Sequence, residues 1–391
     1  MQLSSTASRV PGSGIREIVN LAMARPAGSV VRLEIGEPDV LTPAHVVAAA
    51  VEAASRQAHY THSSGLIELR EHIVGHLNQT YALGTDTDRV VVSQGAVQAL
   101  AVIFAAVLSP GDEVLVADPA WPNYEMQAIL LGATVRRYAT PAENAFMPDV
   151  REIERLITDR TKILVLNSPS NPTGAVMDAA TVQSIVELAA SRGILVVSDE
   201  VYDEIVFDGT HVSAMPYAPE SVASVFSFSK TYSMTGWRVG YAALPGWLAE
   251  TVGRLQEPFL SSVSEVTQRA AIAAISGPQQ SLAINRELYR SRRDLVVNLL
   301  HAAGIDVQSP GGAFYLMMPL GEGVDSRAAA VDLVAHGVST APGTAFGAEA
   351  SSMLRLSLAS SPEALTEGVD RILAWHAATD AGRTVGLLAA R

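Results

Sequence analysis

The chain is 391 residues long with a mass of 41.2 kDa, which exceeds one minimal domain and indicates two or three domains. Apolar residues make up 48% and charged residues 17%, so the composition excludes an intrinsically disordered chain. The net charge of −13 argues against a nucleic-acid partner, although it leaves room for a local basic pocket that binds a small anion.

Cysteine content and hydropathy indicate the cell compartment in which we expect the protein. The chain has no cysteine, which rules out a disulfide framework, a thiolate zinc site and a cysteine nucleophile, and which fits a reducing cytosol. The longest clean apolar run, residues 99–108, has about half of the ~20 residues that a bilayer span needs. The first 28 residues contain three arginines and no apolar block, unlike a signal peptide. We therefore expect a cytoplasmic protein that binds neither a membrane nor a nucleic acid.

Short β-branched runs alternate with helical stretches between residues 45 and 275. Apolar residues recur at helical spacing from Val182 to Ala189, with Asp178 as a candidate cap and Gly193 as a candidate stop. Such alternation predicts an α/β fold, in which residues 45–275 form a large domain with a mostly parallel sheet flanked by helices. Five runs are expected to be its buried strands, at residues 89–93, 113–117, 162–167, 194–198 and 224–228.

The alternation of short β-branched runs and helical stretches ends at about residue 277. A long charged stretch at 281–303 predicts an extended helix, and a second helical segment is expected near 328–336. Between and after them lie PGGAFYLMMPL (310–320), MLRLSLAS (353–360) and a final helix. This pattern predicts a smaller α+β domain made of residues 29–44 plus 276–391. Residues 1–28 are expected to form an N-terminal arm.

Several common site signatures are missing from the sequence. It contains no HExxH, no GxxxxGK[ST], no GxSxG and no glycine fingerprint after a predicted strand. The nine histidines are scattered, and the closest pair, His59 and His62, has no acidic neighbour at ligand spacing. We therefore expect no metal site.

Polar residues of different chemical types follow four of the predicted strands. The four segments are SQGA (93–96), NSPSNP (167–172), SDEVY (198–202) and SFSK (227–230). Each has an ordinary explanation when taken alone, because NPTG (171–174) makes a good turn, Asp199 can cap a helix and Lys230 can be an exposed lysine. Together they bring an acid, a phenol, an amide, a lysine and a glycine-opened helix to the sheet edge where α/β proteins bind ligands.

The chemistry of these residues suits pyridoxal phosphate. A lysine that forms a Schiff base needs a carbonyl cofactor, which pyridoxal phosphate supplies. Its ring nitrogen accepts electrons when protonated, and a neighbouring carboxylate such as Asp199 favours that protonated form. A tyrosine hydroxyl and an asparagine amide can donate to the phenolate oxygen. The phosphate suits a helix N-terminus, hydroxyl groups and an arginine.

At these positions the sequence resembles the class I/II aminotransferases, pyridoxal-phosphate enzymes of fold type I in the aspartate aminotransferase-like superfamily. The resemblance rests on several motifs in the family order and runs nearly end to end. These motifs are LEIGEPD (33–39), Tyr60, the segment 65–70, NPTG (171–174), DEVY (199–202), SFSK (227–230), TGWRVG (235–240), PGGAFY (310–315) and RLSL (355–358).

The resemblance implies a role for each matching residue at the cofactor. Lys230 matches the Schiff-base lysine that later moves the proton between Cα and C4′, and Asp199 matches the partner of the ring nitrogen. Tyr202 and Asn171 match the donors to the phenolate oxygen. The other implied cofactor-binding residues are Trp121, which stacks on the ring, Tyr60 from a neighbouring subunit, and, at the phosphate, Gly95, Ala96, Val97, Ser227, Ser229 and Arg238.

The resemblance also implies how substrate is bound. Arg355 matches the arginine that holds the substrate α-carboxylate in a planar fork, and Gly36 matches the small residue that lets this carboxylate approach. Trp121 and Asn171 are expected to contact substrate as well. Val97 stands where some aspartate-using members have a lysine, which makes an aspartate or glutamate specialist less expected.

The implied activity is transfer of the amino group of an L-amino acid to a 2-oxo acid by a ping-pong mechanism. The alternative is a C–S lyase or another reaction at Cα or Cβ, because the same motifs serve that chemistry. A cofactor-sensing regulator of the same fold would need a DNA-binding segment, and residues 1–28 are too short and polar to supply one.

The resemblance finally implies a homodimer with shared active sites. Tyr60 and the segment 65–70 match the family's interface loop. We further expect the apolar residues of the N-terminal arm, Ile15, Ile18, Val19 and Leu21, to lie across the partner.

Overall fold

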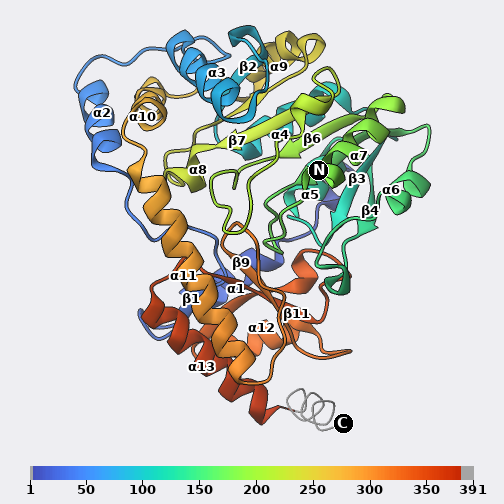
Figure 1. The fold of residues 1–391 in the computed structure, drawn as a ribbon, viewed down its shortest axis with the longest axis vertical. Helices are drawn as coiled ribbons and strands as arrows, with labels where there is room; N and C mark the ends of the chain where they lie inside the picture. The colour runs from blue at the N-terminus through green and yellow to red at the C-terminus, as the bar shows by residue number, and fades with distance from the viewer. Residues whose placement is uncertain (1–2, 380–391) are drawn as a thin grey trace.

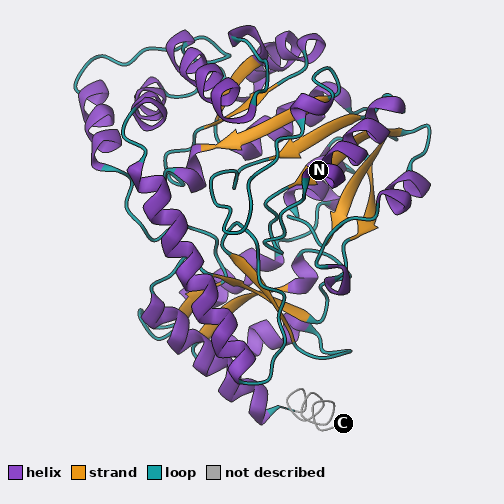
Figure 2. Cartoon of the chain, viewed as in Figure 1, coloured by secondary structure: helices purple, strands orange, loops and turns teal. Residues whose placement is uncertain are grey.

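The protein, described by a computed structural model over residues 3–379, has two sheets covered by helices (Figures 1 and 2). The larger sheet has the strand order β2-β8-β7-β6-β5-β3-β4. All its neighbouring strands are parallel except β8, which runs antiparallel to both β2 and β7. The bounds are β2 Val90–Ser93, β3 Glu113–Asp118, β4 Thr134–Ala139, β5 Thr161–Asn167, β6 Leu195–Asp199, β7 Val222–Ser227 and β8 Gly240–Ala243.

Alternate residues of the large sheet face two different cores. In β5, Ile163 and Val165 belong to one apolar cluster, whereas Leu164 and Leu166 belong to the other. Because both faces are covered, these strands are continuous apolar runs, and the predicted α/β fold is confirmed. The helices of this part are α2 Ala44–Ala54, α3 Ile67–Tyr81, α4 Ala96–Val107, α5 Asn123–Leu130, α6 Val150–Leu156, α7 Ala179–Ser191, α8 Phe228–Thr231, α9 Gly246–Leu260 and α10 Glu265–Ser276.

The smaller sheet has four strands in the order β1-β10-β11-β9, and only the β1–β10 pair is parallel. Its strands are β1 Val31–Leu33, β9 Tyr315–Pro319, β10 Val338–Pro342 and β11 Met353–Ser357. Its helices are α1 Gly14–Met23, α11 Gln280–Ala302, α12 Ser326–Ala335 and α13 Pro362–Ala378. In Figure 1 the long helix α11 runs from the part that holds the large sheet to the part that holds the small one. Within the described residues, no helix is long and apolar enough to cross a membrane.

Two strands of the large sheet were not expected from the sequence. Strand β4 lies at the sheet edge and carries two arginines, so it lacks the apolar run of a central strand. Strand β8 is Gly-Tyr-Ala-Ala, and a Cβ at Gly240 would lie 2.8 Å from the backbone nitrogen of Ala96. Glycine is therefore required at position 240 for close packing, although it is a poor strand former.

The last predicted strand also ends one residue earlier than expected. Phe228 begins α8, because the Ser227 hydroxyl accepts a hydrogen bond from the backbone nitrogen of Ser229 and caps that short helix.

The N-terminal segment packs on its own chain. Helix α1 is capped by Ser13, whose side chain accepts a hydrogen bond from the backbone nitrogen of Arg16, and it contacts β10 and α12. Ile18 and Val19 are buried there. The expectation that these two side chains lie across a partner is therefore wrong, because the small sheet of the same chain already removes them from water.

Candidate active site

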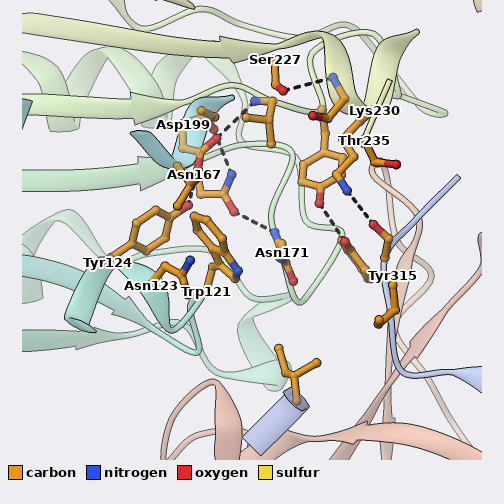
Figure 3. Close-up of a pocket in the computed structure, with 18 of the residues that line it drawn as sticks. Trp121, Asn123, Tyr124, Asn167, Asn171, Asp199, Ser227, Lys230, Thr235 and Tyr315 are labelled. Atoms are coloured by element: carbon orange, nitrogen blue, oxygen red, sulfur yellow. Dashed lines mark hydrogen bonds between the residues drawn. The ribbon is translucent and has the colours of Figure 1, made fainter. Parts of the chain in front are cut away.

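The parallel strands of the large sheet end beside a cavity of about 320 Å³. Residues of both sheets and of α1 line it, so the cavity lies between the two parts of the molecule. In Figure 3, Trp121 and Tyr124 lie on one side of the cavity and Lys230 and Tyr315 on the other, with Asn171 between them. Of the site residues expected from the sequence, it is lined by Gly36, Ala96, Val97, Trp121, Asn171, Asp199, Tyr202, Ser227, Ser229, Lys230, Arg238 and Arg355.

One end of the cavity is a cradle for an anion. Helix α4 begins there, directly after Gly95, whose φ of 78° is the left-handed conformation that glycine tolerates. A Cβ at Gly95 would lie 2.6 Å from the Arg238 Nη2 atom, so the missing side chain lets the guanidinium reach the helix N-terminus. Ser227 and Ser229, which carry hydroxyl groups, line the same cavity. Helix N-terminus, guanidinium and hydroxyls together fit a phosphate dianion.

Asp199 supplies a buried acid at the end of β6. Its side chain accepts a hydrogen bond from the Tyr124 hydroxyl at 2.6 Å and one from the backbone nitrogen of Val201 at 3.3 Å. Burial raises the pKa of the Asp199 carboxyl to about 6, although both hydrogen bonds favour the ionised form. Such a group gains from a cationic partner in the cavity, which a protonated ring nitrogen would be.

Tyr124 is the functional neighbour of Asp199 that the sequence analysis did not identify. It lies on α5, and its ring meets Trp121 edge-on with centroids 5.4 Å apart. Because Trp121 lines the cavity, this contact fixes the orientation of the flat indole face beside the ligand. Trp121 lies just before α5, and the backbone nitrogen of Tyr124 donates to the Trp121 carbonyl oxygen at 3.3 Å, so a turn at the start of the helix brings the two side chains together.

Lys230 presents the only amine of the cavity lining. Its Nζ donates to the Gly36 carbonyl oxygen at 2.6 Å. Burial lowers the pKa of the Lys230 ammonium to about 8, opposed by the negative charge of Glu37. The whole chain contains just one other lysine, Lys162, at the opposite end of strand β5 from the cavity. A nucleophilic amine in this cavity is therefore Lys230.

Arg355 is held in a fixed orientation at the small-sheet side. Its Nη1 donates to the Asn171 side-chain oxygen at 2.9 Å and its Nη2 to the Glu34 carbonyl oxygen at 2.5 Å. The guanidinium lies between the rings of Tyr315 and Phe346, at 4.3 and 4.8 Å from their centroids. Its buried Nε has no hydrogen-bond partner among the described residues. An immobilised guanidinium with a donor to spare suits a carboxylate ligand.

Two tyrosines and a glycine shape the wall between Lys230 and Arg355. The Tyr202 and Tyr315 hydroxyls lie 2.8 Å apart, and burial raises the pKa of both, so both stay protonated and can donate. A Cβ at Gly36 would lie 1.7 Å from the Tyr315 hydroxyl oxygen. Position 36 therefore accepts only glycine while Tyr315 keeps its place.

Two expected site residues do not line the cavity: Gly95, which directly precedes the lining residue Ala96, and Tyr60. The Tyr60 side chain is 93% exposed, in a separate surface hollow that Trp237 and Arg238 also line. Since Arg238 also lines the main cavity, the hollow lies behind the anion cradle.

Comparison with known proteins identifies the class of enzyme. Residues 28–372 match the family described as aminotransferase class I and II. The chain belongs to this family, whose members use pyridoxal phosphate. It is a pyridoxal-phosphate-dependent aminotransferase that moves the amino group of an L-amino acid to a 2-oxo acid by a ping-pong mechanism.

Relatives with different substrates resemble the chain to a similar degree. The aspartate/prephenate aminotransferase of Thermus thermophilus is 36% identical over 90% of this chain and 92% of its own. The arginine–pyruvate transaminase of Pseudomonas aeruginosa is 36% identical over 95% and 97%. Among solved structures, the Thermus thermophilus aspartate aminotransferase with maleate superposes with a TM-score of 0.92 at 34% identity, covering 96% of this chain and 99% of that one.

Proposed function

We propose that the cavity holds pyridoxal phosphate with the phosphate at the N-terminus of α4 and the ring beside Trp121. In this arrangement Arg238, Ser227, Ser229 and the backbone of Gly95, Ala96 and Val97 bind the phosphate, and Asp199 pairs with the protonated ring nitrogen. Tyr202 and Asn171 donate to the phenolate oxygen. When bound, the cofactor supplies a carbonyl group for the amine and an aromatic ring that accepts electrons from Cα.

Lys230 is the proposed catalytic base. Its lowered pKa leaves about a tenth of the amine neutral at pH 7, far more than an ordinary lysine would have, and both nucleophilic attack and proton abstraction require the neutral form. Its Nζ lies at the Gly36 carbonyl, next to the proposed substrate position. From there it can take the proton from the substrate Cα and return it to the carbon that receives the amino group.

Arg355 is the proposed partner of the substrate α-carboxylate. The unpartnered Nε and the two flanking rings support this role, because the guanidinium is already oriented and partly desolvated before substrate arrives. Gly36 leaves the space beside it, while Trp121 and Asn171 contact the same substrate. The observation that carries the proposal as a whole is the meeting of one amine, one buried acid and one anion cradle in a single cavity.

The proposed assembly is a cytoplasmic homodimer in which each site receives Tyr60 from the other chain. The strong exposure of Tyr60, on the side of Arg238 that faces away from the cavity, supports this arrangement. The absence of cysteine is compatible with a reducing cytoplasm. We also propose residues 45–275 as the large domain and 29–44 with 276–391 as the small one.

A half-reaction tests the proposed function against the C–S lyase alternative. The loaded enzyme, mixed with an L-amino acid alone, should release one equivalent of the 2-oxo acid while the cofactor gains the amino group and the hydrogen and gives up its carbonyl oxygen. Adding a second 2-oxo acid should then restore the starting absorbance. Release of ammonia and pyruvate from a sulfur amino acid, without accumulation of aminated cofactor, would instead support the lyase.

A further inference from the structure

The cavity lining contains more side chains than the cofactor and the α-carboxylate require. After the proposed roles are assigned, the aliphatic residues Ile15, Ile35 and Val201 remain. Ile15 is in α1 and Ile35 lies two residues beyond the end of β1, on the side of the cavity that holds Arg355. Ile35 directly precedes Gly36, whose carbonyl accepts from Lys230, and directly follows Glu34, whose carbonyl accepts from Arg355. An amino acid held between Lys230 and Arg355 therefore lies against this segment.

Every charged group of the lining already has a partner in the proposed complex. Three cations line the cavity within the described residues: Lys230, Arg238 and Arg355. They are assigned to the amine chemistry, the phosphate and the α-carboxylate. The one acid of the lining, Asp199, is assigned to the ring nitrogen. A second carboxylate on the substrate would be buried without a cation, and a guanidinium or ammonium without an acid.

The surface around Tyr60 is poor in cations. Among the described residues that line that hollow, Arg238 is the one lysine or arginine, Glu265 is the one acid and His59 is the one histidine. The chain's second lysine, Lys162, is part of strand β5 and lines neither hollow. The hollow that holds Tyr60 therefore offers the site a phenol and no lysine or arginine besides Arg238, which is assigned to the phosphate.

We propose that the amino donor is an L-amino acid with an uncharged apolar side chain, and that Ile15 and Ile35 form the wall that selects it. This inference rests on the proposed function, since it uses the assigned positions of the amine and the α-carboxylate. Ile15 is well suited to the role because Ile18 and Val19, one helical turn along α1, are buried in the small domain and anchor the helix. The helix thus presents a fixed apolar side chain to the cavity.

Single-turnover half-reactions of the loaded enzyme test the substrate class. Leucine, methionine and phenylalanine should aminate the cofactor at least about tenfold faster than aspartate, glutamate or arginine at equal concentration. Aspartate reacting as fast as leucine would overturn the inference while leaving the aminotransferase intact. If no amino acid aminates the cofactor, the proposed function itself fails, so the two failures are distinguishable.

A charge introduced at position 15 tests the wall directly. Ile15→Lys should raise the ratio of aspartate to leucine rates by about tenfold or more, since it places a cation beside the substrate side chain. Leu21→Lys is the matched control, because Leu21 lies on the same helix, is 38% exposed and does not line the cavity. This variant should keep the wild-type ratio of aspartate to leucine rates.

Equilibrium binding provides a readout without turnover. The loaded wild type should bind 4-methylpentanoate more tightly than succinate, and Ile15→Lys should reduce or invert that preference. Equal preference in the wild type and in both variants would show that α1 takes no part in selection and would overturn the role of Ile15.

Discussion

At the scale of single residues, Asp199 illustrates a conflict between stability and function. The unfolded chain exposes this carboxyl with its ordinary pKa near 4, whereas burial raises the pKa to about 6 in the folded protein. The folded state therefore binds the proton more tightly, and its stabilising contribution is complete at low pH and lost as pH rises through 6. The cofactor-free protein is expected to lose about 2 kcal/mol of folding free energy from this one group between pH 4 and 7.

Asp199→Asn should consequently have opposite effects on the two forms of the protein. The amide cannot ionise, so the stability of the cofactor-free variant relative to the wild type should increase as pH rises from 4 to 7. Chemical denaturation at each pH measures the free energy of unfolding of both proteins. The loaded variant should lose about 100-fold or more in kcat, because the ring nitrogen loses the carboxylate that keeps it protonated. A stability difference that does not change with pH would contradict the argument.

Lys230 gives a second prediction at this scale. Neutral amine is the reactive form, and its fraction rises with pH, so covalent capture of pyridoxal phosphate by the cofactor-free protein should accelerate to a midpoint at about pH 8. Stopped-flow absorbance measures this rate. After borohydride reduction, the label should be on Lys230 alone. Lys162→Arg should keep the profile and Lys230→Ala should lose capture, whereas a midpoint near 10 would show that burial does not activate the amine.

At the scale of elements, the junction of β2 and α4 is the most sensitive position. Gly95→Ala adds left-handed strain and a Cβ that would lie 2.6 Å from Arg238 Nη2, so the guanidinium must move away from the helix N-terminus. We expect the dissociation constant of pyridoxal phosphate to rise about tenfold, since part of a charge-assisted contact is lost. Fluorescence titration of the cofactor-free variant measures this constant.

Gly84→Ala is the control for the backbone strain. Gly84 has φ of 62° but no atom within 4 Å of an added Cβ, so this substitution should cost about 1 kcal/mol of folding free energy and leave cofactor binding unchanged. Equal cofactor affinity in both variants would show that the position of Arg238 does not matter for phosphate binding.

At the scale of the whole molecule, assembly and cofactor retention are expected to be coupled. Sedimentation at micromolar concentration should give twice the chain mass of 41.2 kDa. Tyr60→Phe should weaken cofactor binding by about tenfold and leave the dimer in place, because it removes one hydroxyl and keeps the apolar ring. A fully active monomer, or unchanged cofactor affinity in the variant, would contradict the shared site.

The N-terminal helix shows what only the tertiary structure decided at this scale. Its apolar stripe is visible in the sequence, but a stripe shows only that a face is buried and does not say which surface buries it. Ile18 and Val19 are buried where α1 packs on β10 and α12 of the same chain, which leaves Ile15 at the cavity. Likewise β4 and β8 are identified as strands only by their pairing with β3, β2 and β7, because an edge strand and a glycine–alanine strand carry little apolar signal.

The sequence by itself determined the α/β class, five strands of the large sheet and most of the reactive and charged residues that line the cavity. It could do so because buried parallel strands need apolar runs and because Lys230, Asp199 and Arg355 are side chains whose chemistry has few equivalents. The tertiary structure decided which groups meet: Tyr124 with Asp199, and Tyr315 with both Tyr202 and the Arg355 guanidinium. These contacts join residues far apart in the chain, and no local pattern encodes a distance across the fold.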